Sequence, residues 1–377
     1  MIGLYLHIPF CRVKCPYCDF YSLPFSEELA DGYTAALIRA IKSHPFGPLQ
    51  ADTLYLGGGT PSLLGKRRLT AILDAAVRSF DLGADSEITL EVNPESAALP
   101  LLRDLRRAGY NRLSVGLQSG SQAELAALGR THTPEQACGA ILAGAEAGFE
   151  NISADLMLAT PGQNEQSLAR SIRMLTELPV THLSAYLLKL EPGRALAGQG
   201  LDLPGEDQTA DLYLGCVDQL GGAGFAQYEI SNFARPDRES RHNLKYWRRS
   251  PYLGLGPAAH SFLSPAGREA ARFFFPPDLG AFLAAEDPFR LLEYDPPPSA
   301  WQEEVLLRLR LTEGIDTAIL REWELDPAPL LKKAGELAAH GLCRVEDGVA
   351  SLTPKGFLLS NPITVSLLDA LEPPVDL

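Results

Sequence analysis

The chain has 377 residues, of which 46% are hydrophobic and 21% are charged, proportions that are ordinary for a soluble globular protein. This length exceeds one ordinary hydrophobic core and predicts more than one domain. The net charge of −14 at pH 7 argues against a nucleic-acid-binding protein, which would usually present a basic face.

Short β-rich runs alternate with longer amphipathic stretches over the first half of the chain. We expect strands at Gly3–Ile8, Thr53–Leu56, Glu87–Val92, Arg112–Val115, Ser153–Leu158 and His182–Leu187. We expect helices at Glu27–Ile41, Arg67–Phe80, Leu99–Ala108, Pro134–Gly148 and Glu165–Leu178. Six such repeats predict an α/β fold in which right-handed crossovers curl a parallel sheet into a partial (β/α)6 barrel. The active site of such a barrel lies at the C-terminal ends of the strands.

The second half of the chain is punctuated by glycine and proline. A Gly/Pro-rich connection at residues 191–207 leads to an expected helix at Gln208–Leu220, and proline clusters at Pro276–Pro277 and Pro296–Pro298 predict a domain boundary near residue 299. Beyond it we expect helices at Trp301–Leu311, Ala318–Trp323 and Pro329–His340, then a hairpin that turns at Asp347–Gly348. This pattern predicts a small winged-helix-like α+β domain.

We therefore divide the chain into a barrel core at residues 1–190, a barrel extension at 191–298 and the winged-helix-like domain at 299–377. The last domain is not basic, so we expect it to pack or to dock a partner rather than to bind DNA. No apolar run is long enough to cross a membrane, so any membrane association is expected at the surface. No charged and then apolar leader precedes the first expected strand.

Three cysteines, Cys11, Cys15 and Cys18, have the spacing C-x3-C-x2-C. A [4Fe–4S] cluster normally takes four cysteine ligands, so three would leave one iron open to chelate a small molecule. The alternative is a structural zinc site with His7 as the fourth ligand, although His7 lies in an expected strand. The other cysteines lie singly among apolar residues, which predicts buried thiols and a protein of the reducing cytoplasm.

A glycine-rich run, GGGTPS at residues 57–62, directly follows the second expected strand. Without Cβ atoms, its backbone could approach a polar ligand closely, and a sharp turn is the alternative. Two tyrosines lie near the cysteines: Tyr5 on the first strand and Tyr17 just before Cys18. Either could cover an adenine ring or belong to the core.

Four polar residues stand at or after later strands: Glu91, Gln118, Arg130 and Asp155. A carboxylate inside a barrel is costly unless it is paired or hydrogen-bonded. One interpretation is an ion pair between Arg130 and Asp155, and the other is a site for ribose hydroxyls and a carboxylate. As a set at one face of the barrel, the four residues favour the binding site.

The run HNLKYW at His242–Trp247 combines a histidine with aromatic and basic residues. Such a histidine could ligate a haem iron, and the basic residues at positions 245, 248 and 249 could pair with the propionates. His260, in GLGPAAHSF, is a rival ligand. A structural role is the alternative for both histidines.

Taken together, the motifs resemble the radical S-adenosylmethionine (SAM) family. The resemblance covers about residues 3–262 and rests on LYLHIPFCRVKCPYCDF, YLGGGTPSLL, SVGLQS, DLM-x-x-x-PGQ and YEISNFA…SRHNLKYW…GLGPAAHS. More narrowly, the chain is similar to a branch that contains oxygen-independent coproporphyrinogen III oxidases and haem chaperones. The oxidases resemble C-x3-C-x2-C-x-C and carry a long segment ahead of the motif. Here Phe20 takes the place of the extra cysteine and ten residues precede Cys11, which favours the chaperones.

The resemblance implies that the three cysteines hold the cluster and that the open iron takes the methionine end of SAM. It implies SAM contacts from Tyr5, Tyr17, Gly58, Gly59, Thr60, Glu91, Gln118, Arg130 and Asp155, and a haem site made of His242, Asn243, Tyr246 and Trp247. The expected activity is haem binding and transfer to acceptor proteins. The alternative is radical decarboxylation of porphyrinogen propionates, with electrons from a flavodoxin-like donor. The chain departs from the family pattern at Gly120, where an aromatic residue is usual, and at Ala159–Thr160, where Gly-Leu is usual.

Overall fold

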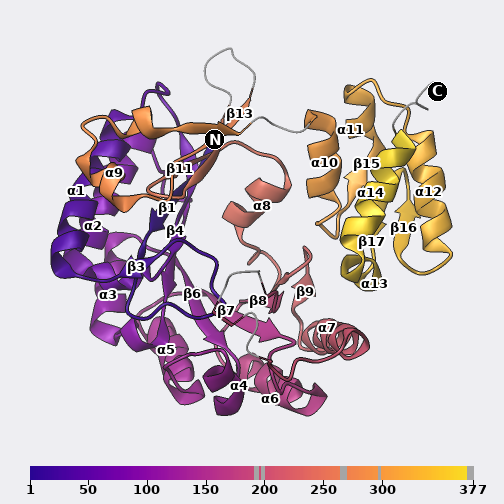
Figure 1. Cartoon of the computed structure of the whole chain (residues 1–377), viewed down its shortest axis with the longest axis horizontal. Coiled ribbons are helices and arrows are strands. Elements are labelled where there is room, and N and C mark those ends of the chain that lie inside the picture. The colour runs from indigo at the N-terminus through magenta and orange to yellow at the C-terminus, as the bar shows by residue number, and fades with distance from the viewer. Residues whose placement is uncertain (191–194, 197–199, 264–269, 296–298, 372–377) are drawn as a thin grey trace.

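Six parallel strands form the centre of the fold, side by side in the order in which they occur in the chain (Figure 1). They are β1 (Ile2–Ile8), β4 (Ala51–Gly58), β5 (Glu87–Val92), β6 (Arg112–Gln118), β7 (Asn151–Leu158) and β8 (His182–Leu187). The computed structural model describes residues 1–190, 195–196, 200–263, 270–295 and 299–371. All six predicted strands are confirmed to within a few residues at each end, and so is the α/β class.

Helices cover the outer face of this parallel sheet. They are α1 (Glu27–Ser43), α2 (Gly65–Phe80), α3 (Leu99–Ala108), α4 (Gln122–Ala127), α5 (Pro134–Glu146), α6 (Glu165–Thr176) and α7 (Glu206–Gly222), with short 3-10 turns η1 (Pro61–Leu64) and η2 (Pro94–Ser96). The side chains of Ser26, Thr133 and Asn164 accept hydrogen bonds from backbone amides in the first turns of α1, α5 and α6. Polar caps therefore fix where these helices begin.

Short strands extend the parallel sheet at both edges to twelve strands in the described residues. β11 (Tyr252–Leu255) pairs in parallel with β1, on the side opposite β4. The remaining additions are antiparallel: β12 (His260–Leu263), β13 (Ala271–Phe274) and β14 (Glu293–Asp295) beyond β11, and β10 (Asn232–Ala234) and β9 (Ala226–Gln227) beyond β8. Helix α9 (Leu279–Ala284), the turn η3 (Pro288–Leu291) and a two-stranded ladder of β2 (Phe10–Cys11) and β3 (Leu23–Pro24) complete this part.

The chain ends in a small separate layer of helices beside the barrel (Figure 1). Its elements are α10 (Ala300–Arg308), β15 (Ile315–Asp316), α11 (Thr317–Glu322), α12 (Ala328–Ala338), β16 (Cys343–Glu346), β17 (Val349–Leu352), α13 (Pro354–Leu358) and α14 (Ser360–Leu371). The predicted hairpin turn is confirmed, because Asp347 and Gly348 both have positive φ, 49° and 80°. Pro296–Pro298 lie outside the described residues, and the domain limits at 190 and 298 stay a prediction.

A short helix that the sequence analysis did not predict, α8 (Arg241–Trp247), closes the end of the barrel at which the strands begin. The backbone amide of His242 donates to Glu87, the first residue of β5, over 3.0 Å. Its ring also contacts Thr53 near the start of β4 and lies against Gly3 of β1. No helix in the described residues is long and apolar enough to span a membrane.

Candidate functional site

The loop that carries the cysteines is fixed to the glycine-rich turn by backbone hydrogen bonds. The amide of Gly59 donates to the carbonyl of Ile8 over 2.9 Å, and that of Thr60 donates to Phe10 over 2.7 Å. A Cβ atom on Gly59 would lie 2.5 Å from the Phe10 carbonyl oxygen. Glycine is therefore required here because the two backbone segments approach so closely.

Gly58 has a second role in the same turn. Its φ of 105° favours glycine, and a Cβ atom would lie 2.4 Å from the ring of His7. Its amide donates over 3.0 Å to the Glu91 carboxylate, which also accepts a 2.8 Å bond from the hydroxyl of Tyr55. The turn thus holds a partly buried carboxylate in place.

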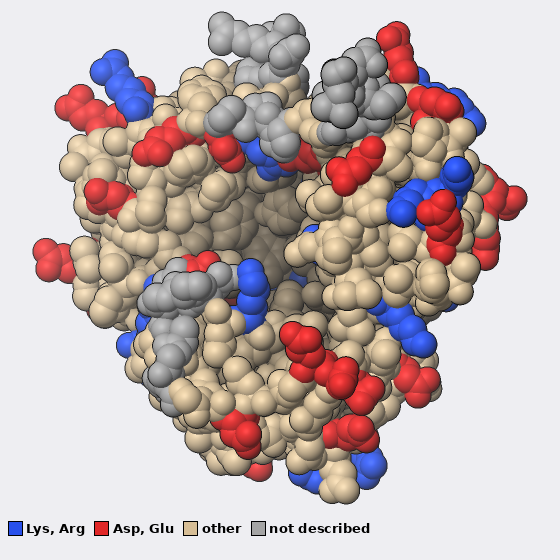
Figure 2. Space-filling view, turned by 45° about the vertical axis from the view of Figure 1, so that its right-hand side comes forward, with Lys and Arg blue, Asp and Glu red and all other residues tan. Residues whose placement is uncertain are grey.

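The inward-facing side chains of the strands and the cysteine loop together line a cavity of about 380 Å³. Figure 2 shows a central hollow in the molecule whose walls are mostly uncharged. The cavity is lined by all three motif cysteines and by these predicted SAM-binding residues: Tyr17, Gly58, Gly59, Thr60, Glu91, Gln118, Arg130 and Asp155. Tyr5 is not among the lining residues, and its hydroxyl lies 3.0 Å from Nδ1 of His7 instead.

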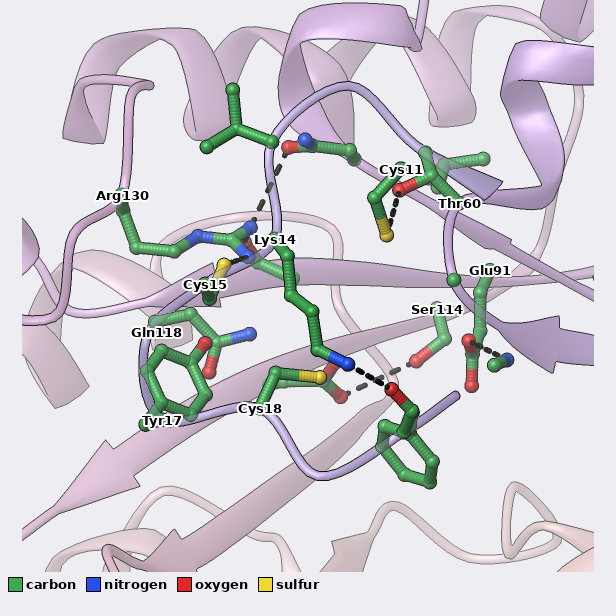
Figure 3. A pocket seen from close by; sticks show the side chains of 18 of the residues that line it. Cys11, Lys14, Cys15, Tyr17, Cys18, Thr60, Glu91, Ser114, Gln118 and Arg130 are labelled. Carbon is green, nitrogen blue, oxygen red and sulfur yellow. Dashed lines mark hydrogen bonds between the residues drawn. The ribbon is translucent and has the colours of Figure 1, made fainter. Parts of the chain in front are cut away.

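The three cysteine sulfurs face one common space, and hydrogen-bond donors approach two of them (Figure 3). Nη1 of Arg130 lies 3.3 Å from Sγ of Cys15, and the hydroxyl of Thr60 lies 3.7 Å from Sγ of Cys11. All three thiols are free of disulfide bonds. Hydrogen bonds to cysteine sulfurs are typical of thiolates that ligate iron. The three cysteines and their donors therefore fit a [4Fe–4S] cluster.

His7 does not fit the alternative of a zinc ligand. Its Nε2 lies 2.8 Å from the carbonyl oxygen of Tyr21, and its Nδ1 is bonded to Tyr5. Both ring nitrogens are therefore engaged away from the cysteines. Among the described residues, no three His, Cys, Asp or Glu side chains converge on a single metal ion. Cluster ligands need not do so, because each cysteine binds a different iron.

Two partly buried carboxyl groups face the cavity. Burial raises the pKa of Glu91 to about 7 and that of Asp155 to about 6. Asp155 accepts a 3.3 Å hydrogen bond from Ser114, and neither acid has an ion-pair partner among the described residues. Arg130 instead donates to Cys15 and to the carbonyl of Gly116, so the predicted alternative of an Arg130–Asp155 ion pair is wrong.

The cavity has further lining residues that the sequence analysis did not single out. On β6, Arg112, Ser114 and Gly116 line it together with Gln118, and on β8 Ser184 and Tyr186 do the same. Alternate residues of a strand face one side, so counting back by twos from Gln118 would have found the first three. The β8 pair follows from the register, because Asp155 lies opposite Ser184.

Comparison with known proteins places the chain in a family. The Radical SAM superfamily model matches residues 5–175, and the HemN C-terminal domain model matches residues 295–359. Heme chaperone HemW of Mycobacterium tuberculosis (strain H37Rv) is 37% identical, over 97% of this chain and 94% of that protein. Heme chaperone HemW of Bacillus subtilis (strain 168) is 34% identical, over 98% of this chain and 100% of that protein. The chain belongs to the HemW family of radical SAM proteins.

A solved structure resembles the chain along nearly its whole length. Coproporphyrinogen III oxidase (HemN) from Escherichia coli, described as a radical SAM enzyme, superposes with a TM-score of 0.83 at 26% identity. The likeness covers 97% of this chain and 89% of that one. The barrel and the C-terminal domain are therefore arranged as in that enzyme.

The candidate haem residues on α8 do not face one common site in this structure. His242 is buried, with its Nδ1 2.8 Å from the Thr53 hydroxyl and its Nε2 2.8 Å from the Tyr246 hydroxyl. Its ring also stacks on Tyr55 at 5.3 Å between centroids. Of the four predicted residues only Asn243 lines the cavity, whereas His242, Tyr246 and Trp247 do not.

His260, the rival ligand, has a different environment. It is exposed at the start of β12 and stacks on Phe274 of β13 at 5.0 Å between ring centroids. In the part of the chain that the structure describes, its imidazole has no hydrogen-bond partner. Its nitrogens are thus accessible, whereas those of His242 are occupied.

The two departures from the family pattern have local explanations. The amide of Gly120 donates to Ser171, and a Cβ atom at this position would lie 3.0 Å from the Met174 and Ser171 side chains. Ala159 has a φ of 56°, a left-handed conformation in which the family glycine would be unstrained. Thr160 is buried and donates to Glu124 over 3.4 Å. The changes lie in the loops after β6 and after β7, and none of the three residues lines the cavity.

Proposed function

We propose that this protein is a haem chaperone that holds a [4Fe–4S] cluster and SAM in the barrel cavity and passes haem to acceptor proteins. The observation that carries the proposal is the cavity itself. Three free cysteine sulfurs line it together with two partly buried carboxyl groups that have no ion-pair partner among the described residues. A cationic sulfonium ligand with ribose hydroxyls would satisfy those acids.

Each lining residue then has a stated task. Cys11, Cys15 and Cys18 would ligate three irons, and the bound cluster would supply an open iron for the amine and carboxylate of SAM. Glu91 and Asp155 would accept hydrogen bonds from the nucleoside. The turn at Gly58–Thr60 would cradle the methionine. We also propose a cytoplasmic location, with which six free cysteines agree.

Exposed apolar side chains at the cysteine loop support the haem part of the proposal. Val13 and Phe20 are each 61% exposed and Tyr186 is 40% exposed, and all three line the cavity. Such a group of apolar surface residues is typical of a binding site for an apolar ligand. Arg12 and Lys14, on the same loop, also line the cavity and would suit propionate groups.

The accessibility of the two histidines supports His260 as the axial ligand. Coordination through His242 would require its hydrogen bonds to Thr53 or Tyr246 to break, whereas His260 needs no such change. The experiment is an anaerobic haem titration of the cluster-reconstituted protein, followed at the Soret band. We compare the wild type with His242→Ala, His260→Ala and, as a surface control, His340→Ala.

We expect saturable binding in the wild type and the His340→Ala control, and a loss or shift of the Soret band in the variant that lacks the axial ligand. Wild-type protein with an intact cluster that binds no haem would refute the chaperone proposal. A spectrum unchanged in both His242→Ala and His260→Ala would reject both ligands.

The cluster ligands are tested separately. Cys15→Ala should remove the brown colour and the cluster absorbance, whereas Cys138→Ala should keep them because Cys138 lies on α5 outside the cavity. Iron and sulfide contents are measured after anaerobic reconstitution. Equal contents in both variants would contradict the assignment.

The likeness to HemN favours a second candidate, the oxidative decarboxylation of coproporphyrinogen. In that case the enclosed barrel would exclude water from a reactive intermediate. The test is anaerobic incubation of the reconstituted protein with coproporphyrinogen III, SAM and a flavodoxin-type reductant. Chromatographic loss of substrate would support the oxidase, and unchanged substrate would reject it.

A further inference from the structure

A buried arginine inside the barrel has no hydrogen-bond or ion-pair partner in the part of the chain that the structure describes. Arg112 is the first residue of β6 and is only 2% exposed. Its side chain forms no hydrogen bond or ion pair among the described residues, and its Nε is buried without an acceptor. A guanidinium group stays charged in proteins. Burial without a partner is therefore costly and indicates that an acceptor is supplied from outside the chain.

Arg112 also lines the cavity described above. The alternate residues Arg112, Ser114, Gly116 and Gln118 all line it, so the cavity follows β6 from its first residue to its last. Six strand steps of about 3.3 Å separate the ends, or roughly 20 Å between Cα atoms. Gln118 marks the cysteine end, and Arg112 marks the inner end, where Asn243 of α8 also lines the wall.

The nearby acids do not serve as partners for Arg112. The Glu91 carboxylate accepts hydrogen bonds from Tyr55 and Gly58, and Asp155 accepts one from Ser114. Arg112 shifts the pKa of both acids, and those of His182, Tyr228 and His242, by electrostatic interaction without a hydrogen bond. The five guanidinium donors thus remain available to a ligand in the cavity.

We propose that Arg112 anchors a carboxylate of the ligand at the inner end of the cavity. A guanidinium fork matches a carboxylate with two parallel hydrogen bonds, which a neutral side chain cannot replace. The carboxylate is a porphyrin propionate, because the proposed function places the carboxylate of SAM on the open iron at the cysteine end of the cavity. The inference rests on the proposed use of the cavity as the cofactor and haem site, and SAM serves as the comparison ligand in the experiment.

The experiment compares ligands with and without a carboxylate on the full-length, cluster-reconstituted protein. Dissociation constants are measured for SAM against 5′-methylthioadenosine, and for haem against haem dimethyl ester. The variants are Arg112→Gln, Arg112→Lys and the exposed control Arg78→Gln on α2. We expect Arg112→Gln to weaken haem binding about tenfold to hundredfold and to leave SAM binding unchanged, and Arg112→Lys to restore part of the loss.

The pattern of losses identifies the source of the carboxylate. A loss for haem but not for its ester assigns a propionate, and a loss confined to SAM would overturn the inference. Unchanged affinities in Arg112→Gln, while the wild type binds, would overturn the inference and leave the proposed function standing. A wild type that binds neither SAM nor haem would overturn both.

Urea unfolding provides a second readout that does not depend on ligands. Because Arg112 has no partner in the ligand-free protein, Arg112→Gln should unfold at the same urea concentration as the wild type or a higher one. A large drop in the midpoint, or failure to fold, would show that Arg112 is a structural counter-ion for Glu91 and Asp155. That result would overturn the inference.

Discussion

Nη1 of Arg130 lies 3.3 Å from Sγ of Cys15, although 115 positions separate the two residues in the sequence. The contact joins the loop between α4 and α5 to the loop between β2 and β3. A second bond, from Nη2 of Arg130 to the carbonyl of Gly116 over 3.0 Å, fixes the guanidinium against the strand. A permanently charged donor is thus held beside one of the proposed cluster ligands.

Replacing Arg130 by Gln should lower the reduction potential of the cluster. A positive donor to sulfur stabilises the reduced cluster, which carries more negative charge, so its removal favours the oxidised form. We expect a decrease on the order of 50 mV, which corresponds to about 1 kcal/mol for one electron. The measurement is an anaerobic redox titration followed by electron paramagnetic resonance, with Arg78→Gln as the control. A potential equal to that of the wild type would contradict a functional contact.

The partly buried acid Glu91 predicts a pH-dependent affinity for SAM. Its pKa of about 7 means that raising the pH from 6 to 8 takes the carboxyl from mostly protonated to mostly ionised. A cationic ligand prefers the ionised form, so affinity should rise by up to about tenfold over this range. Glu91→Gln should remove most of the dependence and leave the part due to Asp155, whose pKa is about 6, whereas Glu146→Gln on the outer helix α5 should keep all of it. Isothermal titration at several pH values measures both.

The same acid has the opposite effect on the ligand-free fold. Between its ordinary pKa of 4.5 and about 7, the folded protein keeps a proton on Glu91 that the unfolded chain releases. Stability should therefore fall as the pH rises through this window. Glu91→Gln should weaken the dependence of the urea midpoint on pH. If the variant keeps the wild-type dependence, groups other than Glu91 cause it.

His242 is expected to stabilise the barrel through its ring. Truncation by His242→Ala removes the hydrogen bonds to Thr53 and Tyr246 and the stacking on Tyr55, at a cost of about 2–4 kcal/mol of unfolding free energy. His340→Ala, at an exposed position, should cost little. Urea unfolding at neutral pH compares the two, and equal midpoints would mean that the contacts contribute no net stability.

The pH dependence of that effect has a definite sign. Burial lowers the pKa of His242 to about 3, from an ordinary value of 6.5. Between these values the unfolded chain binds a proton that the folded protein does not. The stability linked to His242 is therefore complete above pH 6.5 and is lost as the pH falls toward 3. His242→Ala should lack this component of acid unfolding.

Two glycine-to-alanine changes should have opposite effects. Gly59→Ala places a methyl group 2.5 Å from the Phe10 carbonyl oxygen and should cost about 1–3 kcal/mol and loosen the cysteine loop. Gly139→Ala, exposed within α5 with nothing near its Cβ position, should stabilise by about 0.5–1 kcal/mol. Thermal unfolding and iron content are measured for both. A Gly59→Ala protein as stable as the wild type and with full iron content would contradict the close-approach explanation.

The central barrel was predictable from the sequence because its hydrophobic residues recur with helical or strand periodicity and its helices carry polar caps. Long periodic segments such as Glu165–Thr176 carry enough repeats to distinguish helix from strand. The four-residue strands β11, β12 and β13 do not, and whether they pair with β1 or with each other depends on the tertiary fold. These strands were not predicted because four residues are too few to show a periodic pattern.

Site residues that stand in or beside a sequence motif were predictable. Residues that reach the site only through strand pairing were not. The cysteines and the polar residues at strand ends were found, because each stands beside a recognisable turn or strand. Arg112 was missed although alternation along β6 from Gln118 leads to it, whereas Tyr186 was missed because only the pairing of β7 with β8 shows that it shares the cavity. The orientation of His242 depends on Thr53, 189 positions away, which no local pattern reveals.

The pairing of β1 between β4 and β11 has a consequence for biosynthesis. Gly3–Leu6 pair with two neighbours, and one of these, Tyr252–Leu255, is synthesised some 250 residues after them. The strand that leads into the cysteine loop is thus the last of the central strands to be flanked on both sides. All the cavity-lining residues lie between Cys11 and Asn243, so the walls of the cluster site are synthesised before β11 completes this side of the sheet.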